Sequence, residues 1–149
     1  MTTLLPECET DWLAAASLDD WHANILCVGE IAPQQNLNLA IVAFDEYRRE
    51  YDPFARLILA GPQTDAAYAR EVRDFVHSLQ IAGHVLMLDP TEAQLKALYR
   101  TADAVLQTGL ECDEEASRIA ARYLVPVISS KDANTPRKLA EAIRDVLFV

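Results

Sequence analysis

"ILCVGEIAPQQNLNLAIVAF" occupies residues 25–44 and joins the two patterns that decide the fold. The apolar run over residues 24–29 ends at Gly29, which is typical of a buried strand in a parallel sheet. From Leu37 onward the apolar residues recur every three or four positions, with charged residues on the opposite side. This period predicts an amphipathic helix that Pro53 ends. A buried strand followed by a helix begins a βαβ unit.

The same alternation continues to the end of the chain. Apolar runs predict further strands at 55–61, 84–88, 102–108 and 125–130, and amphipathic helices follow them. Three start signals support the helices: an N-cap at Thr64 or Asp65, a capping box at 91–94 and Pro136 at the first helical position. The sequence therefore predicts an α/β fold, a doubly wound, Rossmann-like parallel sheet of five to six strands with helices on both faces.

Ligands in such folds bind beyond the carboxyl ends of the strands. The loops expected at that edge are 29–37, 61–65, 89–91, 108–115 and 130–135. A chain of 149 residues fits one domain. Residues 1–22 are acidic and irregular, with Trp12 and Trp21 as large apolar anchors. They are interpreted as a lead-in segment that packs on a domain of residues 23–149.

Charge and hydropathy exclude several classes of partner. The net charge of -10 opposes binding to nucleic acid or to anionic lipid. No apolar run approaches the roughly 20 residues that a membrane span needs. The N-terminus lacks the basic start and apolar stretch of a secretory signal, so a cytoplasmic location is predicted.

The residues that carry metal, redox or nucleophilic chemistry form no recognisable motif. The cysteines are far apart and odd in number, which indicates reduced thiols rather than a disulfide framework. The histidines show no spacing typical of metal ligands. No Walker loop, G-x-G-x-x-G or Ser–His–Asp arrangement is present, so neither a metal nor a cofactor is expected. These residues are Cys8, Cys27, Cys112, His22, His77 and His84.

Several stretches, read in order, resemble one known family. They are "ILCVGEIAPQQNLNLAIVAF", "ARLILAGP", "LKALYRTADAVLQTGLE", "VPVISS" and "LAEAIRDVL". Together they resemble the C-terminal, donor-binding half of the family 4 retaining GT-B glycosyltransferases, also called glycosyl transferases group 1. The lead-in "LLPECETDWL" resembles the segment that joins the two GT-B domains. The resemblance implies a domain that binds a nucleotide-sugar donor.

The first donor motif of that family departs from its pattern here. The family has a stretch close to G-R-x-x-x-x-K-N, whose Arg and Lys neutralise the donor diphosphate. Gly29 and Asn36 match it, but Glu30 stands at the Arg position and Gln35 at the Lys position. A carboxylate about 5 Å from a phosphate charge repels it by roughly 3 kcal/mol at an effective dielectric near 20. The resemblance therefore implies a donor site that has lost its chemistry.

The second donor motif, two Glu separated by seven residues, departs in the same direction. With the alignment anchored on Pro126, Glu111 matches the first Glu, which works near the donor sugar. The second, which binds the nucleotide ribose, falls on Ile119, and an alkyl side chain cannot accept a hydrogen bond. The acidic run over 111–115 stands at a predicted helix start and repels anions there. The stretch after the fifth strand is also shorter than in the family.

Each candidate residue has a plainer interpretation beside the functional one. Glu111 is either the retained catalytic carboxylate or a solvated acid at a helix start. Gly29 and Gly61 serve tight turns after strands, and Asn36 is either a helix N-cap or a ligand contact. Lys131 is either a solvated lysine or a contact for an anion.

Three functions remain open at this point. The first is a non-catalytic, glycosyltransferase-like module of a glycan-assembling system, which pairs with another protein domain or subunit. Binding of a nucleotide-sugar donor is disfavoured in this case. The second is the donor-binding half of a retaining glycosyltransferase whose acceptor domain is supplied elsewhere. The third is a small-ligand sensor at the strand-end crevice, whose acidic rim suits a cation. Because a GT-B cleft lies between two domains, the isolated chain is expected to be inactive in sugar transfer.

Overall fold

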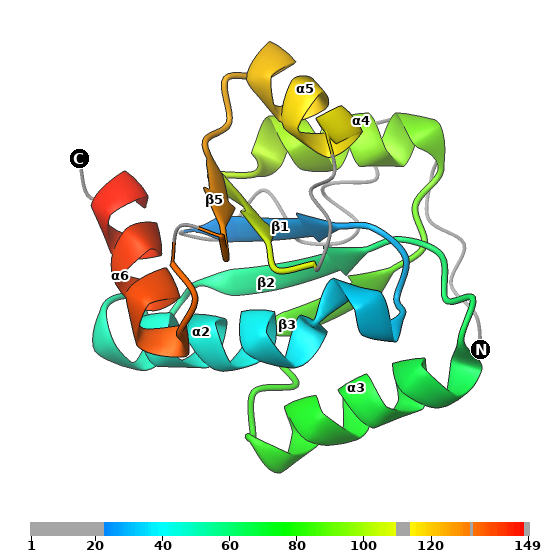
Figure 1. Cartoon of the computed structure of the whole chain (residues 1–149), viewed down its shortest axis with the longest axis vertical. Helices are drawn as coiled ribbons and strands as arrows, with labels where there is room; N and C mark the ends of the chain where they lie inside the picture. The colour runs from blue at the N-terminus through cyan, green and yellow to red at the C-terminus, as the bar shows by residue number, and fades with distance from the viewer. Residues whose placement is uncertain (1–22, 110–113, 132, 148–149) are drawn as a thin grey trace.

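One parallel sheet, in the order β3-β2-β1-β4-β5, forms the centre of the molecule (Figure 1). The computed structural model describes residues 23–109, 114–131 and 133–147. Within these residues the strands are β1 (Asn24–Val28), β2 (Arg56–Ala60), β3 (Val85–Leu88), β4 (Ala104–Gln107) and β5 (Val127–Ser129). The predicted α/β fold with a parallel sheet is confirmed, with strands shorter than the apolar runs.

The strand order reverses beside β1, which fixes where a ligand site belongs. The chain adds β2 and β3 on one side of β1 and then crosses to add β4 and β5 on the other. β1 pairs with β2 along its whole length, from Asn24↔Arg56 to Val28↔Ala60. The switch point therefore lies between the carboxyl ends of β1 and β4, where doubly wound folds bind ligands.

Helices cover both faces of the sheet and bury two apolar clusters. α2 (Leu37–Glu50), α3 (Ala66–Ser78) and α6 (Pro136–Leu147) lie on one face, and α4 (Glu92–Thr101) and α5 (Glu114–Arg122) on the other (Figure 1). Phe44 and Tyr47 of α2 are fully buried in the larger cluster, with the apolar side of α6. Leu98 and Tyr99 of α4 are fully buried in the smaller one. The central strands are buried on both faces, which explains their continuous apolar runs.

The start signals read from the sequence form as predicted. Asp65 rather than Thr64 caps α3, since its carboxylate accepts from the Tyr68 N–H at 3.0 Å. Thr91 and Gln94 form both bonds of the capping box of α4. The Thr135 hydroxyl accepts from the Lys138 N–H at 3.1 Å, directly before Pro136. Each bond satisfies a backbone donor that a helix start leaves unpaired.

Two helices end without the glycine that such ends favour. After α5, the Leu124 N–H bonds to the Ala121 carbonyl and the Val125 N–H to the Ala120 carbonyl, which is the Schellman pattern. Leu124 takes the left-handed position with φ 58 and is 91% exposed. Gln80 takes the same position after α3 with φ 60. Both residues carry the steric strain that a Cβ adds in this region.

Leu124→Gly is expected to raise the free energy of unfolding by about 0.5–1 kcal/mol. The change removes left-handed strain of roughly 1–2 kcal/mol, partly offset by the greater entropy of an unfolded glycine. Denaturant unfolding of the two proteins measures the difference. Leu124→Ala is the control, because it removes the exposed side chain and keeps the strain. Equal stabilisation by both changes would contradict this explanation.

The structure describes only some of the residues on which the predictions about the lead-in segment and the thiols depend. The lead-in segment of residues 1–22 lies outside the described residues.

Cys27 is buried in β1, and burial raises the pKa of its thiol to about 12. It therefore stays protonated at neutral pH and is a poor nucleophile. Over the described ranges, none of the helices is long and apolar enough to cross a membrane.

Candidate functional site

The loop after β1 is hydrogen-bonded to the carboxyl ends of the two neighbouring strands, β2 and β4, at the switch point. The Gly29 N–H donates to the Ala60 carbonyl at 3.0 Å, which continues the β1–β2 pairing beyond the strands. The loop then forms a short 3-10 turn at Pro33–Gln35. On the other side, the Thr108 hydroxyl donates to the Gln35 carbonyl at 2.9 Å, and Thr108 is buried. These bonds fix the position of the turn above the ends of β1 and β4.

Two glycines let the backbones of this site approach each other. Gly29 has φ +143, a backbone conformation that L side chains rarely adopt, so its predicted role in the turn is confirmed. At Gly61, a glycine is required because of a close backbone contact. A Cβ at Gly61 would lie 1.8 Å from the Gly29 carbonyl oxygen. Gly61 lies in the bend directly after β2, as predicted, and it also permits the close contact between the two strand ends.

The Gln35 side chain folds back over Gly29. A Cβ built on Gly29 would lie 2.8 Å from Gln35 Nε2 and 3.1 Å from Gln35 Oε1. The amide thus occupies the space directly beside the Gly29 backbone. At the position where the resembling family carries a lysine, this chain has a neutral group folded against the loop.

Glu30 lies on the exposed side of the same loop. The Thr64 hydroxyl donates to its carboxylate at 3.4 Å, which links the β1 and β2 loops. The sequence of all the carboxyl-edge loops is strongly acidic, and its one basic residue is Lys131. Among the described residues of these loops, the acids are Glu30, Asp65 and Asp89. The edge therefore repels anions, although it lies where such folds usually bind phosphate.

The start of α2 is partly occupied by the protein itself. Asn36 stands at the N-cap position, as expected, but with φ 48 and without a side-chain hydrogen bond to the helix. The Tyr68 hydroxyl of α3 accepts from the Leu37 N–H at 3.3 Å instead. The Leu37 N–H, one of the backbone donors that a helix start leaves unpaired, is therefore bonded within the protein. Fewer N–H groups remain at this helix end for an anion.

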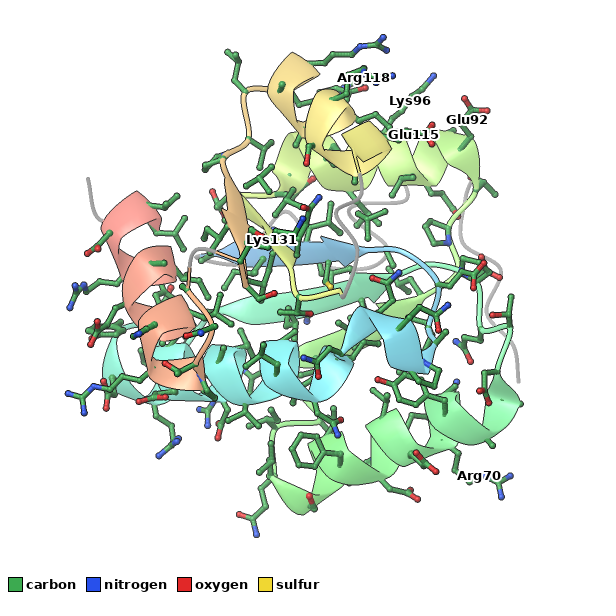
Figure 2. All side chains as sticks on the ribbon, in the orientation of Figure 1. Arg70, Glu92, Lys96, Glu115, Arg118 and Lys131 are labelled. Carbon is green, nitrogen blue, oxygen red and sulfur yellow. The ribbon has the colours of Figure 1, made fainter. Side chains whose placement is uncertain are left out.

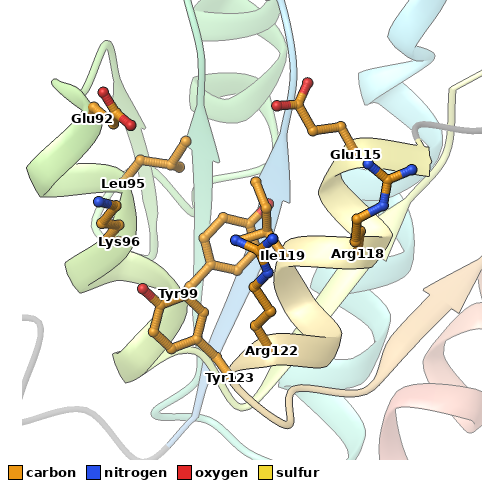
Figure 3. Close-up of a pocket in the computed structure, with 9 residues that line it drawn as sticks. All are labelled: Glu92, Leu95, Lys96, Tyr99, Glu115, Arg118, Ile119, Arg122 and Tyr123. Carbon is orange, nitrogen blue, oxygen red and sulfur yellow. The ribbon is translucent and has the colours of Figure 1, made fainter.

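Ile119 lies in a different hollow. It is on α5 and lines a pocket of about 310 Å³ between α4 and α5, together with Leu95 and Tyr99 (Figure 3). A hydrogen bond of 3.1 Å from Gln107 Nε2 to Ser117 Oγ ties α5 to β4. Ile119, at the position that binds ribose in the resembling family, therefore presents an alkyl side chain to this pocket.

The structure brings together Gly29, Glu30, Gln35 and Asn36, and it places Ile119 in the separate pocket. Glu111 lies outside the described residues. Lys131 is exposed at the end of β5, and its backbone N–H donates to Ser129 Oγ at 3.1 Å (Figure 2).

The sequence did not single out the contributions of Thr108 and Tyr68. Thr108 stood at the end of a predicted strand, and Tyr68 stood on the apolar side of a predicted helix. Both form their site bonds to backbone groups at least 31 residues away. No local pattern signals such bonds.

The comparisons with known proteins agree with this geometry. No curated protein matches the sequence. Among solved structures, WaaG, a glycosyltransferase involved in lipopolysaccharide biosynthesis, superposes with a TM-score of 0.74 at 16% identity. The match covers 98% of this chain and 43% of WaaG, so the chain spans less than half of that protein.

Two further structures show the same fold. The C-terminal domain of LpcC, a glycosyl transferase group 1 family protein from Francisella tularensis, gives a TM-score of 0.74 at 14% identity, over 85% of this chain and 76% of that one. Anabaena Alr3699/HepE in complex with UDP-glucose gives 0.76 at 13%, over 95% of this chain and 43% of that one. At these identities the likeness shows the GT-B half-domain fold. The family model for glycosyl transferases group 1 matches residues 12–141, and the chain belongs to that family.

Proposed function

We propose that the chain is a non-catalytic, glycosyltransferase-like module whose nucleotide-sugar site has decayed. It acts by pairing with another protein domain or subunit in a glycan-assembling system of the cytoplasm. One observation carries the proposal: the switch point presents Glu30 and a folded-back Gln35, and Lys131 is the one basic residue in the sequence of the carboxyl-edge loops. This is where a GT-B donor diphosphate would lie.

The energetics favour loss of donor binding. A facing carboxylate and diphosphate repel by roughly 3 kcal/mol per charge pair at about 5 Å, before solvent screening. Micromolar binding requires only about −8 kcal/mol in total, so the replacement of two cations removes a large share of it. Lys131 is the one basic residue in the carboxyl-edge loops, and it is exposed.

The relatives support the glycan context. WaaG is involved in lipopolysaccharide biosynthesis, and HepE was crystallised with UDP-glucose. This chain corresponds to less than half of either protein. In the proposal, the other half of the cleft belongs to a partner, and the module contributes its fold and its surface rather than donor chemistry.

A second candidate is the donor-binding half of a working retaining glycosyltransferase. The backbone of the switch point favours it, because Gly29 keeps the positive-φ turn that places the loop at the carboxyl edge. In this alternative, the partner domain supplies the missing positive charges to the donor. The two candidates differ in whether the chain alone retains any affinity for a nucleoside diphosphate.

Thermal unfolding with added nucleotides distinguishes them. We expect UDP, GDP, ADP and UDP-glucose, each at about 5 mM and low ionic strength, to leave the midpoint unchanged. A site with a Kd near 0.1 mM would raise the unfolding free energy by about 2 kcal/mol at that concentration, or several degrees. A shift of that size with one nucleotide would overturn the decayed-site proposal and favour the second candidate.

A further inference from the structure

Among the described residues, β3 forms an open edge of the sheet. It stands last in the strand order, and all four of its residues are half-buried. The Leu57 N–H of β2 donates to the His84 carbonyl at 2.8 Å, directly before β3. Backbone groups alternate in direction along a strand, so the next residue that faces β2 is Leu86. Val85 and Met87 therefore direct their N–H and carbonyl groups away from the sheet.

The sequence of β3 lacks the features that usually protect an edge strand. Natural edges are protected by charged residues such as lysine, by proline, by bulges or by short length. β3 reads Val-Leu-Met-Leu, without a charge or a proline. The other edge, β5, is only three residues long and follows Pro126, which has no N–H to donate. Of the two edges, β3 is therefore the one that can pair with a further strand.

A hollow of about 230 Å³ lies beside this edge, between β3 and α3. Its apolar lining comes from Val76, Ala82, Val85 and Met87. Figure 1 shows α3 on the β3 side of the sheet. Alternate side chains of a strand added to β3 would point to the α3 face, and one of them would enter the hollow. In this mode of recognition the backbone bonds supply affinity and the side-chain hollow supplies specificity.

Basic side chains complete the lining of this hollow. Arg73 and His77 of α3 stand at its rim, and both are exposed. Arg73 Nη2 donates to Gln63 Oε1, and the guanidinium has further N–H groups. The acids of α3, Glu71 and Asp74, line a different hollow. In a chain of net charge -10, this rim is a local basic region that favours carboxylates.

We propose that β3 and this hollow, here called the β3 edge groove, bind an extended acidic segment of a partner protein as an additional strand. An apolar side chain of the segment fills the hollow, and carboxylates two residues to either side of it reach Arg73 and His77. The inference rests on the proposed function, because it names the surface and the partner chemistry of that pairing.

A second copy of this chain fits the groove less well than an acidic partner. Antiparallel pairing of two β3 strands would place both α3 helices on the same face of the joined sheet. The two basic rims would then face each other, and two chains that each carry a net charge of -10 would be brought together. Like charges oppose such an association, whereas an acidic segment meets opposite charge at the rim.

The probe is a seven-residue peptide with blocked ends, Thr-Glu-Thr-Val-Thr-Glu-Thr, titrated into the full chain. It reads the same from either end, so it fits parallel or antiparallel addition. Its valine and both glutamates lie on one face of an extended strand. The control peptide has lysine in place of both glutamates. We expect the acidic peptide to bind at least tenfold more tightly at low salt. Equal affinity of the two peptides would overturn the proposal.

Amide hydrogen exchange, followed by NMR, measures strand addition directly. An added strand must bond to the Val85 and Met87 N–H groups, whereas the Leu86 and Leu88 N–H groups face β2 with or without peptide. Saturating acidic peptide should therefore slow exchange at Val85 and Met87 and leave Leu86 and Leu88 unchanged. Peptide binding without this alternating protection would overturn the proposal.

Charge reversal tests the rim. Arg73→Glu should weaken binding of the acidic peptide roughly tenfold or more. The matched control is Lys138→Glu, which makes the same change of net charge at an exposed position on α6 and should leave the binding unchanged. Both positions are exposed, so unchanged thermal midpoints are expected to confirm folding. Equal weakening by the two variants, or unchanged binding by Arg73→Glu, would overturn the assignment.

Exchange measured before peptide is added tests the other occupants. Slow exchange at Val85 and Met87 that is independent of protein concentration would indicate pairing with the chain's own acidic residues 1–22. Protection that increases with concentration would indicate a second copy. Either result would overturn the proposal. The nucleotide experiments test the donor loop and the peptide experiments test the β3 edge groove, so failure of one proposal is distinguishable from failure of the other.

Discussion

Gly61→Ala is expected to lower the free energy of unfolding by about 3 kcal/mol, because overpacking in a close-packed region costs roughly that much. The new Cβ would lie 1.8 Å from the Gly29 carbonyl oxygen and 2.5 Å from its carbon. Both atoms belong to backbone, which cannot rotate away as a side chain can. The ends of β1 and β2 must therefore separate, with loss of the Gly29–Ala60 hydrogen bond.

Urea unfolding monitored by circular dichroism measures this loss, and a fall of roughly 10 °C in the thermal midpoint should accompany it. Gly83→Ala is the matched control, since a Cβ there meets nothing within 4 Å and the backbone is not left-handed. That change should be neutral or should stabilise by about 0.4–1 kcal/mol. Similar stability of the two variants would contradict the close contact at Gly61.

Glu30→Arg combined with Gln35→Lys is expected to raise the affinity for UDP at least tenfold. The two changes replace a repulsive carboxylate and a neutral amide by cations at the switch point. Each charge pair at about 5 Å contributes roughly 3 kcal/mol before screening, and 1.4 kcal/mol is a factor of ten in Kd. The gain should shrink as the salt concentration rises.

The control for this double variant places the same charges elsewhere. Glu50→Arg and Gln80→Lys change the last residue of α2 and a residue just beyond the end of α3, away from the carboxyl edge. The control should leave UDP binding unchanged. Equal affinity of the two double variants for UDP in calorimetry would mean that the position of Glu30 and Gln35 does not limit donor binding.

The fold was predictable because its signals are local. The run at 24–29 is continuous and apolar because β1 is buried on both faces, and the period from Leu37 follows one side of α2. Caps such as Asp65 and Thr91 are short-range bonds that a few residues specify. The ends of α3 and α5 were less predictable, because Gln80 and Leu124 stand where a glycine would normally mark the helix end.

The candidate site was predictable only in outline. The switch point follows from the order of elements, and Gly29, Glu30 and Gln35 do lie there. The fold of Gln35 over Gly29 and the bond from Thr108 to Gln35 depend on contacts between distant segments. Periodicity could not show such contacts.

The pocket between α4 and α5 illustrates the same limit. The sequence places Leu95, Tyr99 and Ile119 on the apolar sides of two helices, which a closed helix contact would also require. How far apart the two helices stand depends on their separate packing against the sheet. The pocket therefore appears only in the structure.

Calorimetric titration of UDP and UDP-glucose into the full chain at low ionic strength tests the central claim most directly. Low salt strengthens any remaining attraction between the site and a diphosphate. The decayed site predicts no saturable heat with either ligand into the millimolar range. Stoichiometric binding with a Kd below about 100 μM, which corresponds to roughly −5.5 kcal/mol, would contradict the account and make the chain a functional donor-binding domain.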